Sequence, residues 1–94
     1  MVNMLEARDK SGRLISLSRE RLRHILAHPE MTNQVEQITE TLLKPDTIIP
    51  FEYDPAVHFY FTYFKERRKY LFVSVKYLNG TGFIITAYYT DKIR

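Results

Sequence analysis

Cysteine is absent from the 94 residues of this chain. Its absence excludes disulfide bonds, thiol catalysis and every zinc or iron–sulfur site that depends on cysteine ligands. No stretch approaches the about 18 consecutive apolar residues that a transmembrane helix needs. The segment from Met1 to Arg13 also lacks the apolar centre of a secretory signal. We therefore expect a cytoplasmic protein that does not associate with a membrane.

Aromatic residues are missing from the first half of the chain, because all seven tyrosines and six phenylalanines lie between Phe51 and Tyr89. Aromatic side chains beside basic residues can stack on nucleobases, but they are also common in strands for ordinary packing reasons. Hydrophobic residues make up 45% and charged residues 27% of the chain, which is typical of a folded domain. The length suffices for one hydrophobic core. The chain length therefore predicts a single domain over residues 1–94, in which residues 1–16 form a flexible lead-in or a short strand.

The formal net charge of +3 at pH 7 is spread unevenly along the chain. One basic cluster lies between Arg8 and Arg23, and a second comprises Lys65, Arg67, Arg68 and Lys69. Such clusters are typical of proteins that bind phosphate groups. A solvated helix face and a charged hairpin tip would explain them without any partner.

The residues before Pro45 follow a helical pattern. Ser18 is expected to cap a helix that runs to about Ala27, and Pro29 ends this helix because it forces the preceding residue out of the helical region. Pro29 is also expected to begin a second helix that Pro45 stops. The apolar face of the second helix would consist of Met31, Val35, Ile38 and Leu42.

The residues after Pro45 are expected to form four strands, at 47–52, 57–64, 70–78 and 83–89. The segment Asn79-Gly80-Thr81-Gly82 predicts a hairpin between the last two strands. We predict a three-residue or bulged loop there and reject a plain two-residue turn, because only the former brings the apolar sets of both strands to one face. These sets are Leu71, Val73, Val75 and Tyr77 on one strand, and Phe83, Ile85, Ala87 and Tyr89 on the other.

Together these elements predict an α+β fold in which two N-terminal helices pack on one face of a four-stranded antiparallel sheet. The other face would be rich in hydroxyl groups and exposed to solvent, as is common for antiparallel sheets. Its residues would be Phe72, Ser74, Lys76, Thr86, Tyr88 and Thr90, joined by His58, Tyr60 and Thr62.

Several short strings in this order resemble the phage-associated members of the barnase–EndoU–colicin–RelE-like (BECR) nuclease superfamily. The resemblance covers about Leu17 to Arg94 and includes the order of two helices followed by four strands. The strings are His24-Ile25, His28-Pro29-Glu30-Met31, Ile38-Thr39-Glu40-Thr41-Leu42, Pro45-Asp46-Thr47-Ile48, Tyr70-Leu71-Phe72-Val73-Ser74-Val75-Lys76 and Gly82-Phe83-Ile84-Ile85-Thr86-Ala87-Tyr88-Tyr89-Thr90.

The resemblance implies a small metal-independent endoribonuclease, as in the toxins of toxin–antitoxin or phage-conflict systems, with RNA as substrate and an antitoxin or other protein as partner. It points to a histidine of the helical half and to basic and hydroxyl-bearing residues of the strands. The matching positions are His24, Lys76, Thr86 and Tyr88.

Cleavage of RNA without a metal needs a base, an acid and cations that stabilise the charged phosphorane. His24 and His28 suit proton transfer, because an unperturbed histidine titrates at about pH 6.5. The candidates for binding RNA are Arg67, Arg68, Lys69, His58 and also His28. We expect no cofactor and no metal, since Pro29 bends the chain directly after His28 and no third ligand is evident.

Two other functions fit the same residues. The domain could be a non-catalytic module that binds RNA or a protein on the same fold. It could also be a homodimer that associates through the aromatic strand at residues 59–64.

Overall fold

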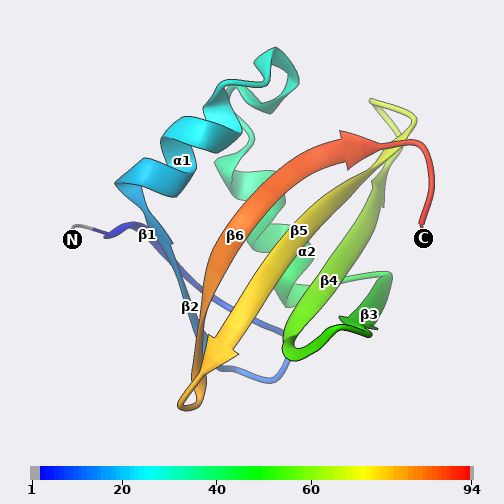
Figure 1. Cartoon of the computed structure of the whole chain (residues 1–94). Coiled ribbons are helices and arrows are strands. Elements are labelled where there is room, and N and C mark those ends of the chain that lie inside the picture. Colours follow the sequence, from blue (N-terminus) through cyan, green and yellow to red (C-terminus); the bar gives the residue numbers. More distant parts are fainter. Residues whose placement is uncertain (1–2, 94) are drawn as a thin grey trace.

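Six strands form one mixed sheet in the order β1-β2-β6-β5-β4-β3, seen in a computed structural model that describes residues 3–93 (Figure 1). Neighbouring strands are antiparallel except β2 and β6, which run parallel. In chain order the elements are β1 (Asn3–Arg8), β2 (Leu14–Ser18), α1 (Arg19–Leu26), the 3-10 helix η1 (Pro29–Met31), α2 (Val35–Leu43), β3 (Thr47–Phe51), β4 (Asp54–Phe64), β5 (Lys69–Leu78) and β6 (Thr81–Thr90).

The predicted four-stranded antiparallel sheet preceded by two helices is therefore wrong. The N-terminal segment forms a hairpin, β1–β2, that precedes both helices and adds two strands to the sheet. Ile15 and Leu17 of β2 are completely buried, so this strand contributes to the core. Through Ile15 and Ser16 it also pairs with one edge of β6, which removes an otherwise unpaired edge from the sheet.

Of the two predicted helices, only the first matches the structure, where it is α1. The Ser18 side chain caps this helix, accepting a hydrogen bond of 3.2 Å from the Arg21 backbone N–H. The second helix begins at Val35 instead of Pro29, because Pro29–Met31 forms only a 3-10 turn. Asn33 then adopts a left-handed conformation with φ of 61°, which interrupts any continuous α-helix.

The hairpin between β5 and β6 uses the two-residue turn that the sequence analysis rejected. Asn79 and Gly80 both have positive φ, at 54° and 83°, and connect the paired residues Leu78 and Thr81. The apolar residues of both strands still share one face, because a bulge lies within β6 instead of in the loop. Val75 pairs with Ile84 and Ser74 pairs with Thr86, so that Ile85 has no partner on β5. Beyond the bulge, Ala87 and Tyr89 face the core as predicted, whereas before it Ile84 is buried in place of Phe83 and Ile85.

The hairpin between β4 and β5 places the opposite set of β4 residues on the core side. Phe64 pairs with Lys69, so that Tyr60 lies beside Val73 and is only 2% exposed. His58, Tyr60 and Thr62 therefore face the helices, and their predicted place on the other side of the sheet is wrong. The residues that do occupy that side are Val57, Phe59, Phe61 and Tyr63.

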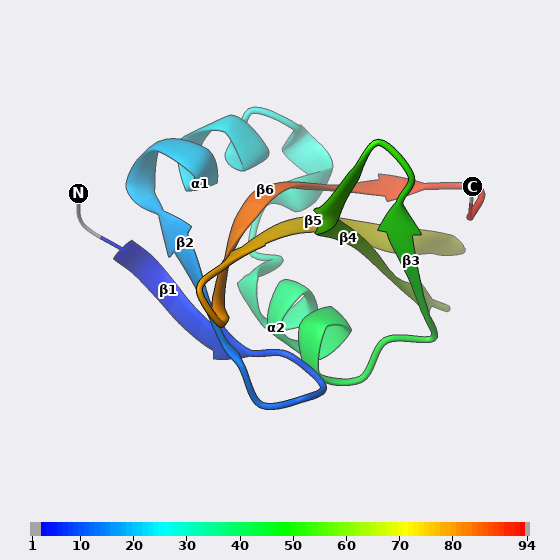
Figure 2. The same ribbon diagram turned by 60° about the horizontal axis from the view of Figure 1, so that its bottom comes forward.

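The core lies between the sheet and the two helices. Buried residues of the helices, Ile25 of α1 and both Ile38 and Leu42 of α2, belong to the same cluster as Val73 and Ala87 of the sheet. The sheet bends around α2, which packs against β1, β4 and β5 (Figure 2). As a result, both helices contact one side of β4–β6, and the other side of these strands carries a separate set of side chains.

Candidate functional site

A row of aromatic rings crosses the side of the sheet that faces away from the core. Phe51, Phe59, Phe72 and Tyr88 come from β3, β4, β5 and β6, and the centroids of successive rings lie 5.2, 5.2 and 4.8 Å apart. Phe61 of β4 is 5.3 Å from Phe72. We call these five residues the aromatic face. Ring pairs at such distances stabilise one another, so the row is an ordered surface made by four strands.

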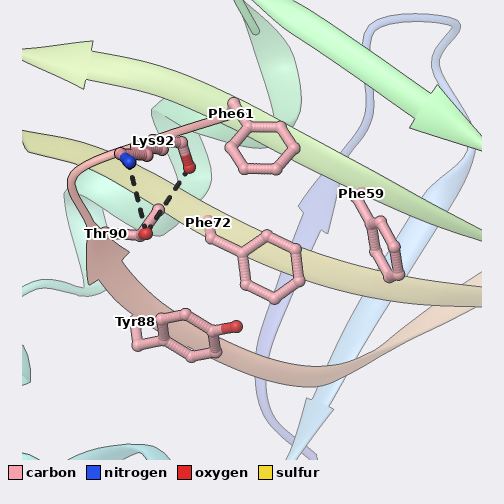
Figure 3. A pocket seen from close by; sticks show the side chains of 6 residues that line it. All are labelled: Phe59, Phe61, Phe72, Tyr88, Thr90 and Lys92. Atoms are coloured by element: carbon pink, nitrogen blue, oxygen red, sulfur yellow. Dashed lines mark hydrogen bonds between the residues drawn. The ribbon is translucent and has the colours of Figure 1, made fainter. Parts of the chain in front are cut away.

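The aromatic face is hollowed into a pocket of about 270 Å³, which is close to the lower end of the about 300–1,000 Å³ typical of small-molecule sites (Figure 3). Phe61 is buried, with 2% exposure, whereas Phe59 and Phe72 are half-buried and Tyr88 is 39% exposed. The lining residues are Phe59, Phe61, Phe72, Tyr88, Thr90 and Lys92. The lining thus combines four aromatic rings with the hydroxyl groups of Tyr88 and Thr90 and with Lys92 from the C-terminal end of the chain.

Thr90 positions the segment that follows β6. Its Oγ1 lies 3.5 Å from both the backbone N and the backbone O of Lys92, the two contacts drawn in Figure 3. These contacts turn the chain back at the end of the strand, and Lys92 itself is exposed. The pocket therefore has one cationic side chain at its boundary with solvent.

Polar groups continue the same side of the sheet beyond the pocket. Ser74 and Thr86 are paired across β5 and β6, and Lys76 follows on β5. The Lys76 Nζ is 3.2 Å from Asp54 Oδ2. The backbone N–H of Ala56 and the Lys76 ammonium lower the pKa of Asp54. The Lys76 charge is therefore paired with a carboxylate of its own chain.

A second polar cluster lies where the β1–β2 loop meets the sheet. Asp9 is completely buried, and its carboxylate accepts hydrogen bonds from Tyr77 OH at 2.8 Å and from Arg13 Nε at 2.9 Å. Three further donors are the Ser11 N–H, the Ser11 hydroxyl and the Arg13 N–H, at 2.9–3.0 Å. Burial raises the pKa of Asp9, but these hydrogen bonds and the Arg13 charge outweigh it, so the pKa lies below its ordinary value.

The phenols of this cluster are arranged to hold the carboxylate. The Tyr60 hydroxyl is hydrogen-bonded to that of Tyr77, and burial raises the pKa of both side chains. The Arg13 guanidinium lies over the Tyr77 ring, 3.9 Å from its centroid, and the His58 ring is 5.1 Å from that ring. Because both carboxylate oxygens are fully engaged with donors of the same chain, the cluster connects the loop to the sheet instead of presenting a reactive group.

The structure brings together only part of the predicted catalytic set. Lys76, Thr86 and Tyr88 share the side of the sheet that carries the aromatic face. His24 is exposed on α1, whose buried Ile25 packs on the core side of β6. The predicted base and the predicted cation are therefore positioned by different layers of the fold.

The predicted RNA-binding residues are similarly dispersed. Arg67, Arg68 and Lys69 lie at the β4–β5 hairpin, where the Arg67 guanidinium is 4.7 Å from the centroid of the Tyr89 ring and so extends toward the core side. His28 is exposed immediately before η1, and His58 faces the core.

Sequence reasoning missed Phe59, Phe61 and Lys92 as site residues. The two-residue alternation of Val57, Phe59, Phe61 and Tyr63 was a usable signal, since these positions share a face in any straight strand. The role of Lys92 had no such signal, because it depends on the turn that follows Thr90.

A scan of protein-family models and searches of curated proteins and of solved structures found no match to this chain. Among residues 3–93, three or more histidine, aspartate or glutamate side chains nowhere gather into a group able to hold a metal ion. Within the same residues, every helix is too short or too polar to cross a membrane.

Proposed function

We propose that this domain is a non-catalytic module that binds single-stranded RNA on its aromatic face. The observation that supports the proposal is the continuous row of rings from Phe51 to Tyr88 across four strands. Unpaired bases stack on aromatic side chains of a sheet surface, and hydroxyl groups between the rings can form hydrogen bonds with base edges and ribose. Thr86 supplies such a hydroxyl on this side of the sheet, whereas its partner Ser74 is buried.

The distribution of charge supports an anionic partner. Thr90 is paired with Tyr70, next to Lys69, the first residue of β5 after the β4–β5 hairpin loop. The exposed residues Lys65 and Arg68 of that loop are therefore at the same end of the sheet as Lys92. Together with a net charge of +3, these cations favour contact with a phosphate backbone.

Binding explains the geometry better than cleavage by the predicted residues. A general base must lie within hydrogen-bond reach of the proton that it removes. His24 belongs to a helix on the core side, whereas Lys76 lies on the other side and is paired with Asp54. We therefore propose RNA binding, and cleavage becomes an outcome that the experiment can reveal.

The proposal predicts that Tyr88→Ala weakens binding of a fluorescein-labelled, mixed-sequence RNA of ten nucleotides. Loss of one stacked base costs about 1–3 kcal/mol, or roughly 5- to 150-fold in the dissociation constant. Tyr88→Phe keeps the ring and should bind like the wild type. Leu43→Ala removes an apolar side chain of similar exposure, 46%, from α2 and serves as the matched control. Fluorescence anisotropy in 50 mM salt with EDTA measures all four proteins.

Three results would contradict the proposal. Tyr88→Ala and Leu43→Ala could bind RNA equally well, which would place the site elsewhere. The RNA could be cleaved in EDTA, which would show catalysis. Light scattering could show a dimer that Tyr88→Ala dissociates without any change in RNA affinity, which would assign the aromatic face to self-association.

A further inference from the structure

Within the aromatic face, we infer that the pocket lined by Phe59, Phe72 and Tyr88 binds a single nucleotide, with its base against the rings and its phosphate at Lys92. The inference rests on the proposed RNA-binding function and specifies the unit that this site recognises. It assigns a phosphate contact to Lys92, outside the two basic clusters of the sequence.

The shape of the pocket fits one planar group. The planes of Phe59, Phe61 and Tyr88 are inclined to that of Phe72 by 54°, 52° and 39°. Rings at these angles surround a hollow instead of forming one flat platform, as Figure 3 shows around Phe72. Since Phe61 is buried beneath the surface and Tyr88 is exposed, a base can enter from solvent and contact several rings at once.

Besides the Tyr88 hydroxyl, the polar residues of the pocket lie at one end of it. Thr90 and Lys92 both come from the end of β6 and the turn after it. A ligand that fills the pocket therefore needs an aromatic part for the rings and an anionic part at one end. A nucleoside monophosphate has this arrangement, and a hydroxyl group and an ammonium group are both suited to phosphate oxygens.

A second hollow of the described surface has different chemistry. It is lined by Arg19, Leu22, Arg23, Leu26 and Ala27 of α1 and measures about 540 Å³. Its two arginines can attract phosphate, but its apolar lining is aliphatic and offers no ring on which a base can stack. The two hollows can therefore be distinguished by whether the base contributes to binding.

The test is an NMR titration of the full chain with three probes: adenosine 5′-monophosphate, adenosine and ribose 5-phosphate. We expect amide shifts at Phe72, Tyr88, Thr90 and Lys92, and binding of the monophosphate about 2- to 5-fold tighter than adenosine, the gain typical of an exposed ion pair. Lys92→Gln should abolish this difference and Lys92→Arg should retain it. Lys10→Gln, which removes the charge of an exposed lysine in the β1–β2 loop, is the matched control.

The outcomes separate this inference from the proposed function. Equal binding of the monophosphate and adenosine, no effect of Lys92→Gln, or shifts confined to α1 would overturn the nucleotide pocket. If the ten-nucleotide RNA still bound in a Tyr88-dependent manner, the proposed function would survive that result. Failure of both the monophosphate and the RNA to bind would overturn both.

Discussion

Replacing Ile15 with alanine is expected to lower the free energy of unfolding by about 2–5 kcal/mol, the usual cost of removing a large aliphatic side chain from a packed core. Ile15 is completely buried in β2 and belongs to the central hydrophobic cluster. Urea unfolding followed by circular dichroism measures the loss. The milder variant Ile15→Val, with an expected loss of about 0.5–1.5 kcal/mol, keeps the measurement possible if the alanine variant does not fold.

This experiment distinguishes the six-stranded sheet from the predicted four-stranded one. If residues 1–16 were a lead-in outside the core, Ile15→Ala would change stability by no more than a surface substitution, within about 0.5 kcal/mol. Val35→Ala is the control, because Val35 is 38% exposed at the start of α2. Equal effects of the two substitutions would contradict the packing of β2 against the core.

Replacing Asp9 with alanine is expected to lower the free energy of unfolding by about 2–4 kcal/mol. Hydrogen bonds to a charged group contribute about 1.5–3 kcal/mol, and a donor left unpaired in a buried position adds a cost of its own. The variant would remove the acceptor of the Tyr77 hydroxyl and the two oxygens around which the β1–β2 loop is arranged. Asp91→Ala, at an exposed position after β6, is the control for loss of a carboxylate.

The contribution of Asp9 should also depend on pH. Its pKa in the folded protein lies below the ordinary value of 3.8, so its stabilising effect is complete above the unfolded pKa and is lost as the pH falls through the folded pKa. The difference in stability between the wild type and Asp9→Asn should therefore be constant from pH 7 to about pH 5 and decrease below about pH 4. A difference that stays constant down to pH 2 would contradict a buried, ionised Asp9.

Local signals were sufficient where neighbouring residues decide the structure. The cap at Ser18 and the helix after it depend on a hydrogen bond that spans three residues. The position of the hairpin at Asn79 and Gly80 follows from two residues that tolerate positive φ, although the three-residue or bulged loop predicted there is wrong. The places of the last four strands also follow from short runs of β-branched and aromatic residues, and their observed bounds differ from the predicted ones by no more than three residues.

The predictions of which side chains face the core failed where one residue more or less in a loop or strand exchanges the two faces of the sheet. The loop between Phe64 and Lys69 decides which alternating set of β4 side chains faces the core. The predicted side of Tyr60 is therefore wrong. On β6 the bulge between Ile84 and Thr86 exchanges the two faces of the strand partway along it. Neither effect has a signature in the alternation of residues within one strand.

The sequence by itself determined the first helix, the last four strands and the concentration of aromatic residues within those strands, because each of these depends on contacts along the chain or on composition. Only the tertiary structure decided that β1–β2 joins the sheet, that Phe59, Phe61, Phe72 and Tyr88 meet on one side, and that Asp9 is buried beneath Tyr77. These features depend on pairing between distant segments, such as Ser16 with Phe83 and Asp9 with Tyr77. Such pairing is decided by which arrangement buries the most apolar surface while satisfying every buried polar group, and that balance involves the whole chain at once.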